Sequence, residues 1–524
     1  MMLGIAHPYM NKTGRLRRFG AIALLFASCL YSTCMLSATA RAEDILNVAL
    51  SNLPSGRGNV FNSTSGLPGL YTYAAIFDGL TRVDGHANAV PMLAESWVQD
   101  SPKSWTFSLR PDITFSNGEP FNADAVVFAI NLIKSPEHLT YPIAVELSEI
   151  TGADVVDDRT VRIRTENTDV LLPNLISALK FVAPRYWQQV GADEFALRPV
   201  GTGPFEVTSW TPTRAELVRA ETAWRQPKFD KLHFIVAIEP SVRLQSVLSG
   251  QADIAVALGA EDIEPIESAG HKMFIGSDGG VQALAFNTVR VSPIQNADVR
   301  RALNYAIDRN ALSVGLLGKR TPLASQPSPP GAFGHDDTID VWPYDPVHAR
   351  ELLAQAGYPD GFSFVAEIRT GLPPETTSFY QQIAADLAKI NVHLEVRAIP
   401  GSQYARGIYD GEWQGEAVGI DYGLIPSLDA LKPIYRHSCL WPKPWYCDPT
   451  ILPLVAAAAG AETVEQRRTL TEKVMRHQVD QAAAIFMFEL TRFDGVASDI
   501  EGYGVEVGFV DYAAIGRTPN AGRR

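Results

Sequence analysis

The stretch SFVAEIRTGLPPETTSFYQQIAADLAKINVHLEVRAI, residues 363–399, indicates the fold class. Two apolar runs, 363–369 and 393–399, have the composition of strands and bracket an apolar-periodic helix at 378–392. Strands joined through a helix pair in parallel, with a right-handed crossover. At least this part of the chain is therefore expected to be α/β.

The N-terminus has the layout of a secretory signal peptide, residues 1–42. Arg15, Arg17 and Arg18 precede an apolar run that ends at Ala40-Arg41-Ala42, and cleavage is expected after Ala42. Two alternatives are a membrane anchor, because the run is nearly long enough to span a bilayer, and a lipoprotein attached at Cys29. An exported, periplasmic protein is the main expectation.

Removing residues 1–42, which carry five Lys and Arg and no acid, takes the formal charge from −13 to −18. Such an acidic chain argues against nucleic acid as a partner. The remaining 482 residues exceed what one core holds, so two or three domains are expected.

Cys439 and Cys447 are the only cysteines beyond the signal, and they enclose CLWPKPWYC. An even pair in an oxidising compartment predicts an intramolecular disulfide. A metal site is the weaker alternative, because no second cysteine pair accompanies them. We expect no metal and no cofactor.

The sequence holds no motif that specifies catalysis. It lacks GxSxG and HExxH, the Gly318-Lys319 segment departs from a Walker A loop, and GTGPFE at 201–206 lacks the third glycine of a dinucleotide fingerprint. Triads assemble in space, so this absence is weak evidence. It favours binding over enzymatic turnover.

Several segments in fixed order extend over nearly the whole mature chain. They include PMLAESW (91–97), PVGTGPFEVTSW (199–210), DVRRALNYAIDRNAL (298–312) and YDPVHARELLAQAGYPDGF (344–362). Together these segments resemble the family 5 extracellular solute-binding proteins, which are periplasmic components of ABC importers for peptides, dipeptides and nickel.

The resemblance implies a two-lobed periplasmic binding fold, type II-like, with an extra inserted domain and a ligand cleft between the lobes. The strands ALAFNT (283–288) and IFMFEL (485–490) would cross between lobes. Residues 298–318 have the apolar periodicity of one amphipathic helix, which would lie within the lobe formed by residues 286–487. The expected division is 43–78, 201–285 and 488–524 for lobe I, 79–200 for the inserted domain and 286–487 for lobe III.

The resemblance also implies ligand-binding residues. Asp421-Tyr422 match the family segment whose Asp pairs with a ligand ammonium, although Gly-Leu-Ile follows where relatives have Pro-Asp-Pro. Arg369 ends a strand where relatives hold an Arg for the ligand carboxylate. The alternatives are a solvated loop Asp and a surface Arg.

Trp441, Trp445 and Tyr446 are candidate pocket walls, since relatives carry a comparable segment beside the cleft. A hydrophobic cluster that pins a long loop is the alternative. His437 leaves open a metal chelate, since nickel-binding relatives use a histidine in the cleft.

The resemblance implies a monomeric, non-enzymatic subunit that delivers a small solute, most simply a peptide or amino-acid-like compound, to an ABC permease. Opines, sugars and metal chelates are alternative ligands. A sensor or chaperone-like binding protein and a secreted hydrolase are alternative functions.

Overall fold

The computed structural model describes residues 43–518 except 63–66, 318–320 and 372–373. The predicted signal peptide, with Cys29 and the cleavage site at Ala42, lies outside the described residues. Residues from Asp44 onward form one compact unit. No helix within the described residues is long and apolar enough to cross a membrane.

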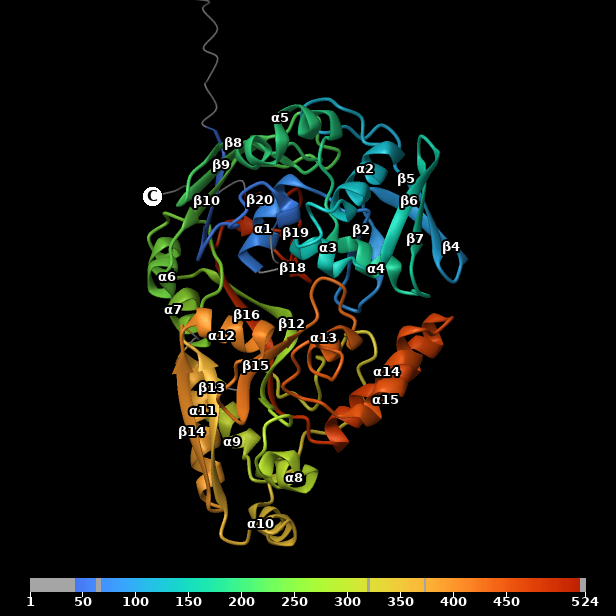
Figure 1. Cartoon of the computed structure of the whole chain (residues 1–524). Helices are drawn as coiled ribbons and strands as arrows, with labels where there is room; N and C mark the ends of the chain where they lie inside the picture. The colour runs from blue at the N-terminus through green and yellow to red at the C-terminus, as the bar shows by residue number, and fades with distance from the viewer. Residues whose placement is uncertain (1–42, 63–66, 318–320, 372–373, 519–524) are drawn as a thin grey trace, which may run out of the picture. The chain divides into compact units, whose positions relative to one another are not determined.

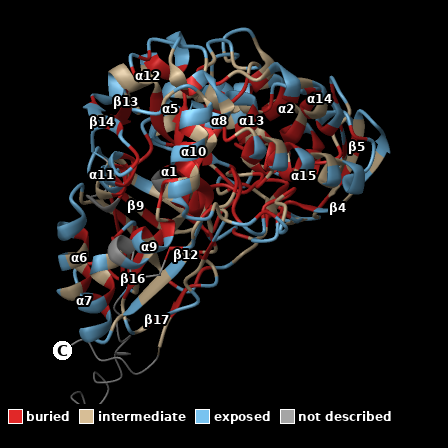
Figure 2. Cartoon of the chain, turned by 90° about the horizontal axis from the view of Figure 1, so that it is seen from below, coloured by how far each residue is buried: buried red, intermediate tan, exposed pale blue. Residues whose placement is uncertain are grey.

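One mixed sheet of ten strands organises the described chain, and the predicted α/β class is confirmed. The sheet order is β14-β13-β15-β12-β16-β11-β1-β10-β9-β8. Figure 2 shows buried residues along these strands and exposed residues on the outer faces of helices. The strands are β1 (Ile45–Leu50), β8 (Phe205–Trp210), β9 (Arg214–Arg219), β10 (Lys231–Val236), β11 (Ile254–Ala255), β12 (Lys272–Phe286), β13 (Phe362–Arg369), β14 (Val392–Ile399), β15 (Ala417–Gly423) and β16 (Ala484–Val496).

The predicted strand-helix-strand unit is confirmed. β13 and β14 pair in parallel from Phe362↔Val392 to Arg369↔Ile399, and α11 (Pro374–Ala388) connects them. The apolar face of α11 supplies Phe379, Ile383 and Leu387 to a core against this sheet. That burial fixes the helix, which isolated propensity alone would not.

β12 and β16 are the long central strands, and Figure 1 shows them side by side. Their antiparallel pairing runs from Lys272↔Val496 to Ala285↔Ala484, with an irregularity between Ser277 and Val281. β15 adds to one end of β12, while β11 adds to the opposite end of β16. The run predicted as a strand at 283–288 is thus the end of a longer strand that stops at Phe286.

A separate antiparallel sheet lies within residues 79–200. Its order is β4-β5-β7-β6, and α2 (Ala123–Lys134) packs on it. Asn122 caps α2 by accepting a hydrogen bond from the Ala125 N–H, as the sequence predicts. The strands are β4 (Ala94–Ser101), β5 (Ser104–Leu109), β6 (Ile150–Asp157) and β7 (Thr160–Thr165).

The single helix predicted over 298–318 is wrong. The chain forms α8 (Ala297–Tyr305) and α9 (Arg309–Leu317) instead. Asp308 accepts a hydrogen bond from the Ala311 N–H and starts the second helix, while the buried Arg309 guanidinium donates to the carbonyls of Asn304 and Phe486. Satisfying this buried cation breaks a helix that periodicity alone would continue.

Candidate functional site

The candidate site lies where three neighbouring strands end. β13 ends at Arg369, β15 carries Asp421 near its end, and α12 (Gly401–Asp410) follows β14 directly. β13 pairs in parallel with both β14 and β15, so their carboxyl ends meet at one edge of the sheet. Ligands of open α/β sheets bind outside that edge.

Arg369 and Asp421, both predicted from the sequence, have exposed side chains at this edge. Among the described residues, neither charged group forms an ion pair or a side-chain hydrogen bond. Asp421 lies opposite Gln282 of β12, whose amide donates to the Tyr380 hydroxyl at 2.9 Å. The Arg369 guanidinium and the Asp421 carboxylate therefore lie at the ends of neighbouring strands, and both are free to bind a ligand.

Tyr404 on α12 is a site residue that the sequence did not reveal. Its hydroxyl donates to the Gly419 carbonyl at 3.0 Å, and its ring contacts Trp413. Burial and the nearby Asp421 raise the pKa of Tyr404, while Arg369 and Arg436 oppose that rise. The hydrogen bond to Gly419 holds the Tyr404 hydroxyl against β15, two residues before Asp421.

Tyr422, Trp445 and Tyr446 lie in the protein interior, each at most 2% exposed. Tyr422 stacks on His437 with ring centroids 3.6 Å apart, and Trp445 meets the same imidazole edge-on at 5.1 Å. Tyr446 packs beneath the Arg300 guanidinium. These positions support the hydrophobic-cluster alternative, and ligand contact by the three rings stays a prediction that their burial does not favour.

Trp441 differs from these rings because it is only partly buried. Its indole N–H donates to the Ile408 carbonyl at 2.7 Å, which ties the cysteine loop to α12. The exposed Tyr409, Tyr435 and Arg436 surround it. Of the three aromatic candidates in this loop, Trp441 alone presents surface to solvent.

The predicted Cys439–Cys447 disulfide is confirmed. It closes the loop that contains Trp441 and Trp445, and Thr288 accepts a hydrogen bond from the Cys447 N–H. The loop is thereby anchored both to itself and to the end of β12.

Replacing both Cys439 and Cys447 by serine is expected to destabilise the protein by about 2.5 kcal/mol, because the unfolded chain regains the loop entropy. Urea denaturation of the double variant measures this loss. Thiol titration of the denatured, unreduced wild type should find no free thiol in the mature chain. Two reactive thiols there would contradict the assignment.

His437 is not available to a metal in this structure. Burial, with Arg436 next, lowers its pKa well below the ordinary value, and the imidazole is enclosed by Tyr422 and Trp445. Within the described ranges no group of three or more His, Cys, Asp or Glu side chains is arranged to hold a metal ion. The structure therefore does not support the alternative that His437 binds a metal-chelate ligand.

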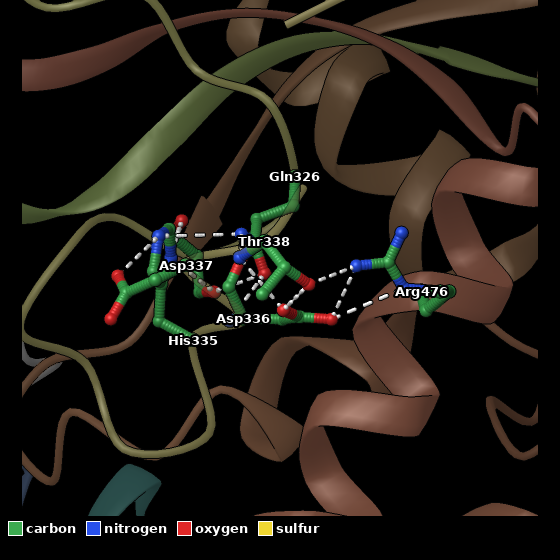
Figure 3. A network of polar contacts seen from close by, with 7 residues as sticks. Gln326, His335, Asp336, Asp337, Thr338 and Arg476 are labelled. Carbon is green, nitrogen blue, oxygen red and sulfur yellow. Dashed lines mark hydrogen bonds and ion pairs between the residues drawn. The ribbon is translucent and has the colours of Figure 1, made fainter. Parts of the chain in front are cut away.

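A second arrangement, Ser328, His335 and Asp337, has the residue types of a catalytic triad (Figure 3 shows the surrounding network). The His335 Nδ1 donates to the Ser328 carbonyl at 2.9 Å, so that nitrogen cannot accept the hydroxyl proton. Asp337 lies 3.7 Å from Nε2 with a side chain 94% exposed, and Ser328 itself is buried. The Ser328 hydroxyl lies 3.3 Å from the same Nδ1, but that nitrogen already donates its proton to the Ser328 carbonyl, so it cannot act as the base that triad chemistry needs.

The same network has a structural role. Asp336 accepts hydrogen bonds from Thr338 and pairs with Arg476 of α15 (Val464–Asp480) at 2.8 Å, and Gln326 bonds across the loop to Asp336. Figure 3 shows these side chains converging from the loop and the helix. The network holds the segment 326–338 against α15.

His335 gives this network a pH dependence. Burial lowers its pKa, so the folded state disfavours the proton. The stabilisation is present above pH about 6.5, the ordinary value of an unfolded histidine, and is lost as pH falls below it. The His335→Gln variant should lose less stability than wild type between pH 7 and pH 5 in denaturant titrations; parallel losses would contradict this.

One further pocket, of about 220 Å³, lies between α13 (Leu431–Arg436) and α14 (Leu452–Ala459). Its charged lining residues are already paired, Asp429 with Arg467 at 2.6 Å and Lys432 with Glu146. The pocket shares none of its lining with Arg369, Asp421 or Tyr404. We therefore do not count it as part of the candidate site.

Comparison with known proteins identifies the family to which this chain belongs. Residues 88–438 match the model of bacterial extracellular solute-binding proteins, family 5. Heme-binding protein A of Haemophilus influenzae is 30% identical over 66% of this chain and 69% of its own length. Glutathione-binding protein GsiB of Shigella flexneri is 29% identical over 76% of this chain and 77% of its own.

Solved structures agree on the fold. The periplasmic binding protein DppA of Helicobacter pylori, in complex with the peptide STSA, superposes with a TM-score of 0.74 at 22% identity, covering 91% of this chain and 98% of that one. The two-lobed binding-protein fold expected from the sequence is confirmed.

Proposed function

Because this chain belongs to the family 5 bacterial extracellular solute-binding proteins, we propose that it is the periplasmic binding subunit of an ABC importer and takes a short peptide or amino-acid-like solute. The proposed ligand class rests on one observation, the pair of charged residues Arg369 and Asp421. Both charges lie at the carboxyl edge of parallel strands, and neither is satisfied by a described side chain.

The chemistry of this pair fits a zwitterion. A guanidinium binds a carboxylate through two parallel hydrogen bonds, and a carboxylate binds an ammonium. When lobes close over a ligand and exclude water, each ligand charge needs an opposite charge. In this proposal Arg369 receives the ligand carboxylate and Asp421 the ligand ammonium.

Trp441 is the aromatic contact that we retain. Its partly exposed ring is fixed by the Ile408 hydrogen bond and by the disulfide, so little side-chain entropy is lost when a ligand packs against it. The buried Tyr422, Trp445 and Tyr446 act by supporting this loop.

The relatives support the assignment without deciding the ligand. Their printed names describe binding of glutathione, heme or peptide, and two of these are amino-acid-derived compounds with an ammonium and carboxylates. Titration calorimetry of the purified protein against a panel of di- and tripeptides, opines and sugars tests the proposal. Binding only to a sugar or an uncharged compound would contradict it.

The proposal includes export. N-terminal sequencing of the protein recovered from the periplasm should begin at Glu43, because the A-x-A triplet ends at Ala42. A lipidated terminus at Cys29 would instead establish a membrane-anchored lipoprotein, and an uncut N-terminus would contradict export through this segment.

A further inference from the structure

We propose that Arg436 is a second carboxylate-binding residue and that the ligand is an acidic short peptide or amino-acid derivative with two carboxylates for one ammonium. The inference rests on the proposed function and specifies its ligand class.

Arg436 ends α13, and its side chain is exposed. Its guanidinium lies over the Trp441 ring, 5.6 Å from the centroid, and forms no ion pair or side-chain hydrogen bond with another described residue. A cation–π contact with an indole favours this placement of the guanidinium and uses none of its N–H donors. The Arg436 guanidinium is therefore held in one place, and its N–H donors are available to a ligand.

Contacts between three segments bring Arg436 to the site. The Tyr422–His437 stack joins the end of β15 to the end of α13, so the preceding residues, Asp421 and Arg436, belong to neighbouring segments. The Trp441 indole binds α12 at Ile408, and α12 also carries Tyr404. The pKa of Tyr404 responds to Asp421, Arg369 and Arg436 together, which agrees with this placement.

Charge balance then sets the ligand class. The site presents two guanidinium groups and one carboxylate, so a complementary ligand carries one net negative charge. Two acids of the neighbouring segments are already paired. Asp278 is paired with Arg492, and Glu412 is paired with Arg406.

Asp494, also on the central strands, is buried and accepts hydrogen bonds from the Tyr503 hydroxyl and the Ala257 N–H. Glu489 is the other acid there. It pairs with Val281, whose other neighbour is Tyr422, whereas Asp421 pairs with Gln282. By strand alternation Glu489 shares the face of Tyr422, and its backbone N–H donates to the Pro322 carbonyl, which ties this part of β16 to the segment 322–323. Burial also raises its pKa to about 7, which leaves it partly neutral at physiological pH.

The alternative role for Arg436 is structural, since a cation near a helix C-terminus interacts favourably with the helix dipole. The two roles differ in their consequence. A structural arginine affects all ligands equally, whereas a carboxylate-binding arginine distinguishes a ligand carboxylate from an isosteric amide.

Calorimetric titration with matched peptides separates the roles. The probes are di- and tripeptides that carry Glu or Gln at one position and alanine elsewhere. Wild type should bind the best Glu peptide at least tenfold more tightly than its Gln counterpart. Arg436→Gln should abolish that preference and leave the affinity for the Gln peptide within about threefold. Arg406→Gln, an exposed arginine on α12 that pairs with Glu412, is the matched control and should keep the preference.

Equal binding of Glu and Gln peptides by wild type, or a preference that survives in Arg436→Gln, would overturn this inference. If those peptides still bind and require Asp421, the proposed function stands without it. If folded wild type binds no peptide in either series, both proposals fail.

Discussion

Replacing Asp421 by asparagine is expected to weaken peptide binding by about a hundredfold or more. The amide keeps the size of the side chain but leaves the ligand ammonium without an opposite charge in a closed, water-excluding site. Removing one partner of a buried ion pair costs about 3–5 kcal/mol. Arg369→Gln should produce a loss of similar size from the other end of the ligand.

Titration calorimetry with one tightly bound peptide measures both variants. Asp360→Asn is the matched control, because Asp360 is an exposed aspartate in the turn before β13 with no side-chain partner among the described residues. Affinities of the Asp421 and Arg369 variants within about threefold of wild type would show that the ligand charges are bound elsewhere.

The Trp445→Ala substitution is expected to lower the free energy of unfolding by about 3–5 kcal/mol. Its indole is fully buried and contacts Trp413 and His437, so truncation removes a large apolar surface and leaves a cavity. The Trp445 indole N–H has no hydrogen-bond partner, so none is lost with it. Chemical denaturation followed by far-UV circular dichroism gives the change.

Trp441→Ala is the comparison within the same loop. That ring is partly exposed, so its truncation should cost clearly less stability than the Trp445 change. Equal destabilisation by the two substitutions would contradict the assignment of Trp445 to the core and of Trp441 to the surface.

The sequence predicted the local architecture well where one local signal dominates. The strand-helix-strand unit of 363–399 follows from apolar periodicity, and the disulfide from two isolated cysteines. The helix over 298–318 failed because its interruption depends on a distant partner. The Arg309 guanidinium bonds to the Phe486 carbonyl of β16, which no local pattern predicts.

The candidate site was only partly predictable for the same reason. Arg369 and Asp421 could be chosen because they occupy positions of a family motif. Tyr404 and Arg436 reach the site through a hydrogen bond to Gly419 and a ring stack between Tyr422 and His437, contacts between segments far apart in the sequence. The residues CLWPKPWYC do not reveal which aromatic ring faces solvent, because strand and helix packing around the loop decides it.

Native mass spectrometry of freshly purified protein tests the central claim most directly, because a tightly held solute often survives purification. The account predicts a bound species with the mass of a short peptide or amino-acid derivative on wild type, and its loss from the Asp421→Asn and Arg369→Gln variants. The same species bound equally to wild type and both variants, or a bound species identified as a neutral sugar, would contradict it.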